Sequence, residues 1–229
     1  TVDSVSSSVK IINDQLKIQH LETDEGYVYD GDGTGTITPF TIMFKSTGEQ
    51  KVKMQLFPET SVLDLFSNCP ITKIQQSIFK NFPDLISVDG CFDGTKITTI
   101  PKDLFKYNPN ITEFSSCFKD CTLLTDVPEG LFDSCPNAEE FTSCFSNCTS
   151  LTVIPEKLIA NNTKVTNFSS CFYQTPITVM PIDNDGTPIY NREDPPGKEG
   201  YAHVGLHSWC FTGTNLPDDV HQAIPAGWR

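Results

Sequence analysis

The stretch CFKDCTLLTDVP, from Cys117 to Pro128, recurs along the chain with the same order of residue types. It consists of a Cys-Phe pair, a short polar turn and an apolar-Thr-x-apolar segment that ends at Pro. The pairs lie 26, 27 and 27 residues apart, the copies being CFDGTKITTIP from Cys91, CFSNCTSLTVIP from Cys144 and CFYQTPITVMP from Cys171. LFSNCPITKI, from Leu65, keeps the pattern 26 residues before Cys91. A repeat of this length indicates a stack of similar structural units.

The second half of each unit repeats as well. Its copies are PKDLFKYNPNITEFSSCF, PEGLFDSCPNAEEFTSCF and PEKLIANNTKVTNFSSCF, with QQSIFKNFPDLISVDGCF as a looser fourth. Each unit predicts a short strand ending at Pro, a helical turn such as residues 101–105, a second short strand such as residues 111–115, and the Cys-Phe turn. Pro is tolerated at the first position of a helical turn, where its missing N–H is not needed. One unit therefore forms one coil.

A single coil cannot bury its own apolar side, so successive coils are expected to stack and share a core. Leu104, Phe105, Phe114 and Phe118, with their equivalents in other units, are the predicted core residues. At a strand spacing of about 4.8 Å, five coils would span roughly 24 Å. The sequence thus predicts a short, compact solenoid.

The units resemble leucine-rich repeats of the BspA type, which run as C-x-x-L-x-x-I-x-I-P followed by V-T-x-I-x-x-x-A-F-x-x-C. CTLLTDVPEGLFDSCPNAEEFTSCFSNC, from Cys121 to Cys148, fits this frame with a few extra residues and with Cys in place of the usual Ala before Phe. The end of the chain is similar to secreted Bacteroides-type members, in which a C-F-x-G unit leads into I-P-x-x-W. This resemblance covers Leu65 to Arg229. It implies an α/β, leucine-rich-repeat-like right-handed solenoid, strand-rich with short helical turns, exported to the bacterial cell surface for adhesion or ligand binding.

Residues 1–60 do not follow the repeat. They contain short segments of alternating apolar and polar residues separated by turns, a pattern that predicts strands. The GDGT turn from Gly31, with Ile42, Phe44, Gly48 and Val52 at later positions, resembles PKD-type β-sandwich domains. A complete sandwich needs about 100 residues. We therefore expect a small N-terminal β unit that caps the first coil, because an open edge recruits other chains.

The chain beyond residue 181 breaks the period. Cys171 and Cys210 are 39 residues apart, and the extra length between Pro181 and Trp209 is rich in Pro and Gly. These residues indicate an inserted loop, which either carries function or covers the last coil, the second interpretation being favoured. The expected division is residues 1–60 as β cap, 61–181 as solenoid, and 182–229 as loop insertion and C-terminal cap.

The net charge of −13 excludes nucleic acid as a favoured partner, because the phosphate backbone would be repelled. The sequence has no run of about 18 apolar residues that would predict a membrane span. TVDSVSSSVK, at the start, has no targeting pattern, so the chain is either cytosolic or has lost its signal. The resemblance favours an extracellular or cell-surface location, with a signal or lipoprotein anchor removed.

Nine cysteines are present, and most of them follow the repeat. Cys91, Cys117, Cys144 and Cys171 occupy one position of the unit, and Cys69, Cys121 and Cys148 occupy another. A small thiol packs well in a core, so buried thiols are expected, with disulfides between coils or a metal site as the alternatives. No C-x-x-C pair supports a zinc site.

Other patterns with possible chemistry are weak. His203, His207 and Cys210 have a spacing that suits metal ligands on a helix, but the neighbouring Gly and Pro disfavour a helix. Residues 30–33 and 183–186 resemble fragments of calcium loops, without the bidentate Glu of an EF-hand. There is no G-x-S-x-G elbow and no phosphate-binding loop. We expect no cofactor, no metal and no enzymatic activity.

One surface pattern is a candidate binding site. Side chains alternate along a strand, so the residues beside the buried Val88, Phe114, Phe141 and Phe168 should point outward. Stacking them gives a polar and acidic stripe of Ser87, Asp89, Glu113, Ser115, Glu140, Thr142, Asn167 and Ser169. The expected function is a non-enzymatic extracellular binding or adhesion module for a host protein or glycan. A scaffold segment of a surface assembly and a glycan-active enzyme are the alternatives.

Overall fold

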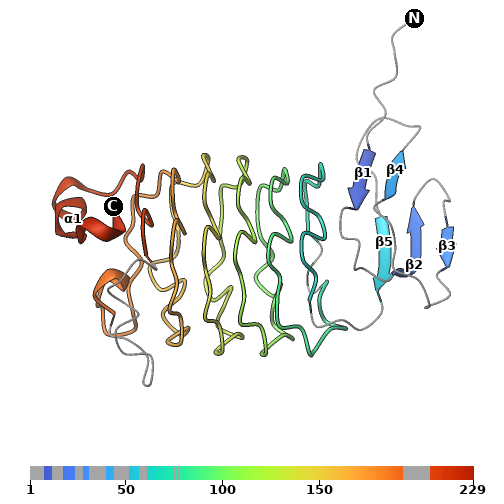
Figure 1. Cartoon of the computed structure of the whole chain (residues 1–229), viewed down its shortest axis with the longest axis horizontal. Coiled ribbons are helices and arrows are strands. Elements are labelled where there is room, and N and C mark those ends of the chain that lie inside the picture. The colour runs from blue at the N-terminus through green and yellow to red at the C-terminus, as the bar shows by residue number, and fades with distance from the viewer. Residues whose placement is uncertain are drawn as a thin grey trace, which may run out of the picture.

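The structure is a computed structural model that describes five strands before residue 61, residues 61–192 except 75 and 77, and residues 207–229. Two small antiparallel sheets precede the coils along the chain (Figure 1). One pairs β1 with β4, and the other has the order β3-β2-β5. The bounds are β1 Ser8–Ile11, β2 Ile18–Thr23, β3 Val28–Asp30, β4 Phe40–Met43 and β5 Val52–Leu56. The PKD-like turn from Gly31 lies outside the described residues.

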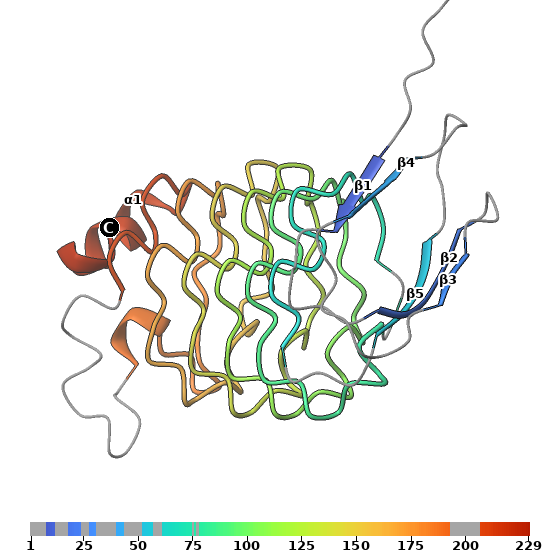
Figure 2. The same cartoon turned by 45° about the vertical axis from the view of Figure 1, so that its right-hand side comes forward.

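From residue 61 the chain winds in coils that stack along one axis, as Figures 1 and 2 show. Single parallel bridges join Ser61 to Ser87, Ser87 to Glu113, Glu113 to Glu140, and Glu140 to Asn167. Around the Cys-Phe turn, backbone N–H groups of one coil donate to carbonyls of the next. The N–H of Phe92 donates to Cys117, that of Phe118 to Cys144, and that of Phe145 to Cys171, each at 2.9 Å. Neighbouring coils are therefore held in register at the repeat distance.

Two residues of each Cys-Phe turn, and of the equivalent Leu65-Phe66 turn in the first coil, have left-handed backbone conformation. One lies immediately before the Cys-Phe pair, and the other lies two residues after the Phe. The first set has φ between 50° and 60° and comprises Asp64, Gly90, Ser116, Ser143, Ser170 and Trp209. The second set comprises Asn68, Gly94, Asp120, Asn147, Gln174 and Gly213. Most of these are Gly, Asn, Asp or Ser, residue types that are frequent in turns, and Gly, Asn and Asp tolerate this conformation best.

These turns explain a difference from the sequence-based expectation. The strand expected at residues 111–115 is a single bridge at Glu113, and the strand expected before Pro101 is a single bridge between Thr99 and Asp126. The chain changes direction at Ser116, so a longer ladder has no room to form. The helical turn expected at residues 101–105 closes with one bond, from Leu104 N–H to the Pro101 carbonyl at 3.1 Å.

The core consists of phenylalanine columns that run along the stack. The longest column has ring centroids 5.4 to 5.9 Å apart and contains Phe66, Phe92, Phe118, Phe145, Phe172 and Phe211. Trp228 covers its end at 6.0 Å. A second column joins Phe79, Phe105 and Phe132 at 5.9 and 6.0 Å. Aromatic pairs of this kind contribute about 0.5–1.5 kcal/mol each beyond the burial of their area.

After residue 182 the described elements are η1 (Ile189–Asn191), α1 (Asp218–Ala223) and η2 (Ala226–Trp228). The Cys210 turn rejoins the stack, because Phe172 N–H donates to the Cys210 carbonyl at 3.0 Å. Phe211 N–H then donates to the Trp228 carbonyl at 2.9 Å, so η2 covers that coil. Among the helices in the described ranges, none has the length and apolar character needed to cross a bilayer.

Candidate binding surface

The Cys-Phe turns of all described coils lie on the same side of the stack. We call this side the turn face and define it as residues 61–68, 87–94, 113–120, 140–147, 167–174 and 207–213. In each segment before the last, N–H groups at alternate positions donate to the next segment, as Val88 does to Glu113 and Gly90 does to Ser115. Side chains at equivalent positions therefore line up in columns on a regular backbone.

The structure brings the eight residues of the predicted stripe together on the turn face. They form two columns, Ser87, Glu113, Glu140, Asn167 and Asp89, Ser115, Thr142, Ser169. Glu113 is the exposed member, and most of the others are partly buried. Ser87 is only 4% exposed, so it does not present its hydroxyl to solvent as the alternation of side chains predicts.

Two side chains of the stripe hydrogen-bond to the backbone of their own turn. Ser87 Oγ accepts a hydrogen bond from Asp89 N–H at 3.3 Å, and Asn167 Oδ1 accepts one from Ser169 N–H at 3.0 Å. Side chains that hydrogen-bond to backbone two residues on are common in turns. For these two residues the structure therefore shows a local structural role.

Carboxylates gather on the N-terminal half of the turn face. Burial, followed by the charges of Asp64 and Glu113, raises the pKa of Asp89. Burial also raises the pKa of Glu140, with a smaller contribution from Glu113 and opposition from a hydrogen bond to Asn167. Like charges on neighbouring coils disfavour ionisation. This half of the face is therefore predominantly negative, although Lys119 pairs with Asp93 and Asp120 within it.

The C-terminal half of the turn face has a different character. Segments 167–174 and 207–213 contain no Asp, Glu, Lys or Arg. Trp209 is 62% exposed, and Tyr173 is partly buried. Trp209 is not among the site residues predicted from the sequence. The signal was present, because Trp stands at a position where the five preceding units have Asp, Gly or Ser.

The cysteines are part of the core. All nine fall in the described part of the chain, are buried and form no disulfide. Cys121 Sγ donates to the Phe92 carbonyl at 3.2 Å, and Cys148 Sγ donates to the Phe118 carbonyl at 3.1 Å. The thiols therefore tie one coil to the coil before it.

His207 occupies the position of Phe168 in the last coil. Its ring lies 5.9 Å from Phe168 and 4.1 Å from Trp228, and Nδ1 accepts a hydrogen bond from Phe168 N–H at 3.4 Å. His203 lies outside the described residues. Within the described ranges no group of three His, Cys, Asp or Glu side chains is arranged to hold a metal ion.

A second ladder crosses the interior on the side of the helical turns. Asn108 Nδ2 donates to the carbonyls of Phe79 and Phe82 in the preceding coil, at 3.0 and 2.7 Å. One coil further on, Cys135 Sγ donates to the Asn108 carbonyl at 3.4 Å. Asn162 Nδ2 then donates to Phe132 and Cys135 at 3.0 and 2.9 Å. Each coil thus satisfies carbonyls of the coil before it.

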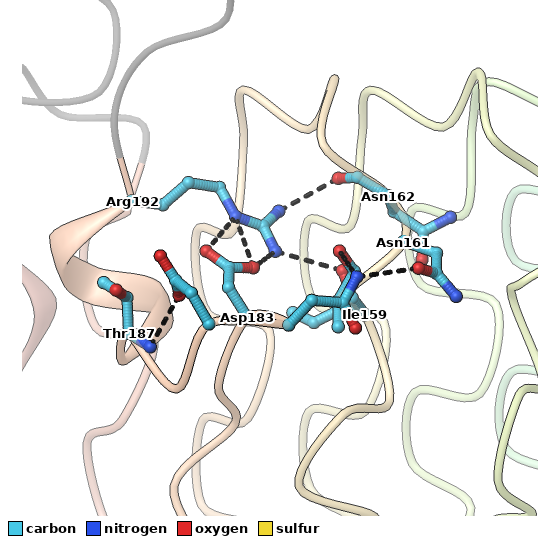
Figure 3. A network of polar contacts seen from close by, with 9 residues as sticks. Ile159, Asn161, Asn162, Asp183, Thr187 and Arg192 are labelled. Atoms are coloured by element: carbon cyan, nitrogen blue, oxygen red, sulfur yellow. Dashed lines mark hydrogen bonds and ion pairs between the residues drawn. The ribbon is translucent and has the colours of Figure 1, made fainter.

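Arg192 ends this ladder (Figure 3). Its guanidinium donates to the carbonyls of Asn162 at 2.9 Å and Ile159 at 3.0 Å, the pair that the next asparagine would otherwise satisfy. Asp183 pairs with the same guanidinium, and both side chains are largely buried. Asp185 accepts from Thr187 N–H at 2.9 Å, so residues 183–186 form an ordinary turn beside the pair. This part of the insertion therefore caps the stack.

A cavity of about 310 Å³ lies between two helical turns, away from the turn face. Its lining mixes charges of both signs and includes Lys102, Asp103, Lys106, Glu129 and Asp133. Lys106 Nζ lies 3.7 Å from Asp103 Oδ2, and Gln76 donates to the same carboxylate at 2.7 Å. The polar side chains that line this cavity therefore pair with one another. For this reason the turn face is the better candidate site.

Comparison of the chain with protein-family models and with curated proteins finds no match.

Proposed function

We propose that the chain is a non-enzymatic extracellular binding or adhesion module of the BspA leucine-rich-repeat kind, which recognises a host protein or glycan through its turn face. The resemblance of the repeat units to that family supports the solenoid fold and the surface location. The alignment of side chains in columns supports the binding role, because a rigid backbone fixes their spacing before a partner arrives.

One observation carries the proposal. Glu113 and Glu140 are bridge partners on neighbouring coils, with Asp89 on the coil before them. Like charges placed opposite one another destabilise a sheet, and burial adds to this cost at Asp89 and Glu140. A protein retains such a cost where function requires it. A basic segment of a partner would neutralise these carboxylates, so the acidic half of the turn face is assigned to a partner rich in Lys or Arg.

A scaffold segment of a larger surface assembly is the second candidate. The observation that favours it is the engagement of Ser87 and Asn167 with their own turns. In that case the stripe would serve the coil and not a partner.

Reversing the charge of Glu113 and Glu140 tests the proposal. The wild-type chain and a Glu113→Lys/Glu140→Lys variant are applied to an array of glycans and extracellular-matrix proteins. We expect at least a tenfold loss of binding to the main ligand, roughly the effect of more than 1.4 kcal/mol, because attraction becomes repulsion. Intact folding is checked by the urea midpoint.

A Glu129→Lys/Glu156→Lys variant is the matched control. It changes the net charge equally, but its two exposed residues lie about half a coil away from the stripe along the chain. We expect wild-type binding from this variant. Equal binding by all three proteins would remove the acidic half of the turn face as the binding site and would favour the scaffold role.

A further inference from the structure

Trp209 departs from the rule that governs its position. In the other described coils the left-handed residue before the Cys-Phe pair, or before Leu65-Phe66 in the first, is small or acidic: Asp64, Gly90, Ser116, Ser143 and Ser170. Trp209 has the same conformation, with φ of 59°, and 62% of it is exposed. A bulky side chain in this backbone region is a rare outlier.

Neither the turn nor the core accounts for this residue. Ser or Gly makes the same turn in four of the other five described coils. The core below it is filled by Cys210 and Phe211, both fully buried. An outlier that the fold does not require is a reason to look for a function. The exposed indole therefore points to a contact outside the chain.

The surroundings of Trp209 define the chemistry of that contact. Ser170 N–H donates to the Ser208 carbonyl at 2.9 Å, and Gln174 N–H donates to the Thr212 carbonyl at 2.7 Å, so the two turns are stacked directly. This pair of turns carries no charged side chain, although the whole chain has a net charge of −13. It carries hydroxyl and amide groups instead, on Ser169, Ser170, Tyr173, Gln174 and Ser208.

We propose that Trp209 is the stacking platform of a subsite for an uncharged sugar ring in a neutral polysaccharide. The C–H face of a pyranose packs on an indole, whose large apolar surface supplies most of the binding energy. The neighbouring hydroxyl and amide groups donate to and accept from the sugar hydroxyls. A sulfated or carboxylated glycan would be repelled by the negative protein. The inference rests on the proposed binding role but assigns a second ligand to the uncharged half of the turn face.

Fluorescence isolates this residue, because the chain has two tryptophans and Trp228 is only 6% exposed. The chain is titrated with dextran, mannan and xylan, and with heparin as the charged polymer. We expect at least one neutral polymer to shift the emission to shorter wavelength and to protect it from acrylamide quenching. Heparin should do neither.

Trp209→Gly separates binding from folding. Glycine adopts the left-handed conformation without strain, so the melting temperature should stay the same or rise by about 2 °C. Retention of the neutral polymer, measured by affinity electrophoresis, should fall at least tenfold. Val153→Ser is the control, because Val153 is 57% exposed and lies outside the turn face, and its retention should equal that of the wild type.

Two results would overturn the inference. One is the absence of any response of Trp209 to the three neutral polymers, and the other is equal retention of Trp209→Gly and wild type. Loss of an array ligand in Glu113→Lys/Glu140→Lys, with no effect of Trp209→Gly on any ligand, would leave the proposed function standing while refuting the sugar subsite.

Discussion

Raising the pH above 9 is expected to unfold the protein in one steep transition. Burial is the main cause that raises the pKa of eight core thiols, Cys91, Cys117, Cys121, Cys135, Cys144, Cys148, Cys171 and Cys210. The pKa of Cys121 and of Cys135 rises from 9.0 to about 12. In the unfolded chain the same thiols ionise near 9.

The direction of the effect follows from proton binding. Above pH 9 the unfolded chain has lost thiol protons that the folded chain retains, so the free energy of unfolding falls as pH rises. Below pH 9 the contribution is fully present. Each thiol lowers the free energy of unfolding by about 1.4 kcal/mol per pH unit in this window. Eight thiols together would remove a typical stability of about 5–15 kcal/mol within roughly two pH units.

Urea midpoints measured by circular dichroism between neutral pH and about pH 10.5 test this expectation. A Cys91→Ala/Cys117→Ala/Cys144→Ala/Cys171→Ala variant should lose about half of the alkaline slope, because four of the eight thiols remain. In addition, a thiol reagent should label no cysteine of the native chain at neutral pH and all nine after unfolding. A midpoint that does not change up to pH 10.5 would contradict the account of the thiols.

Arg192→Met is expected to lower the free energy of unfolding by about 4 kcal/mol. The substitution leaves Asp183 as a largely buried carboxylate without its cation. It also removes the donors to the carbonyls of Ile159 and Asn162, which end the interior ladder. Urea denaturation measures the loss.

The control is Lys157→Met, which removes a cation whose Nζ donates to the Asn184 carbonyl at 3.4 Å on the exposed surface. It should change the free energy of unfolding by less than about 0.5 kcal/mol. Adding Asp183→Asn to Arg192→Met should recover part of the loss, because the buried charge is then absent. A loss below about 1 kcal/mol in Arg192→Met would contradict the capping role of this ion pair.

The repeat distance and the core were predictable from the sequence, because both depend on residue types that recur. Leu104, Phe105, Phe114 and Phe118 are predicted core residues, and each is fully buried. The thiol positions follow the same logic, since Cys121 and Cys148 recur at the distance at which their coils stack.

The backbone of the turns was not predictable in the same way. Ser116 and Asp120 belong to residue types that also occupy ordinary loop positions, so residue type alone did not identify them as left-handed, yet they limit the expected strands to single bridges. Ser87 was expected to point outward, but its hydroxyl serves Asp89 N–H and the residue is buried. Local hydrogen bonds of this kind compete with side-chain alternation.

The residue that ends the interior ladder could not be predicted from the sequence either, because it does not occupy a position of the repeat. Arg192 lies in the insertion, where the repeat is interrupted. Its guanidinium donates to the two carbonyls that an asparagine of a further coil would otherwise satisfy. Trp209 was visible as an exception at its position, but its exposure and its left-handed φ required the folded coil.

Carboxylate footprinting tests directly whether the turn face is the binding surface. The chain is labelled at exposed Asp and Glu side chains, free and bound to the strongest matrix ligand of the array, and the labels are located by mass spectrometry. We expect protection of Asp89, Glu113 and Glu140, with Glu129 and Glu156 labelled as in the free chain. Protection of Glu129 and Glu156 with unchanged labelling of Glu113 would contradict this expectation.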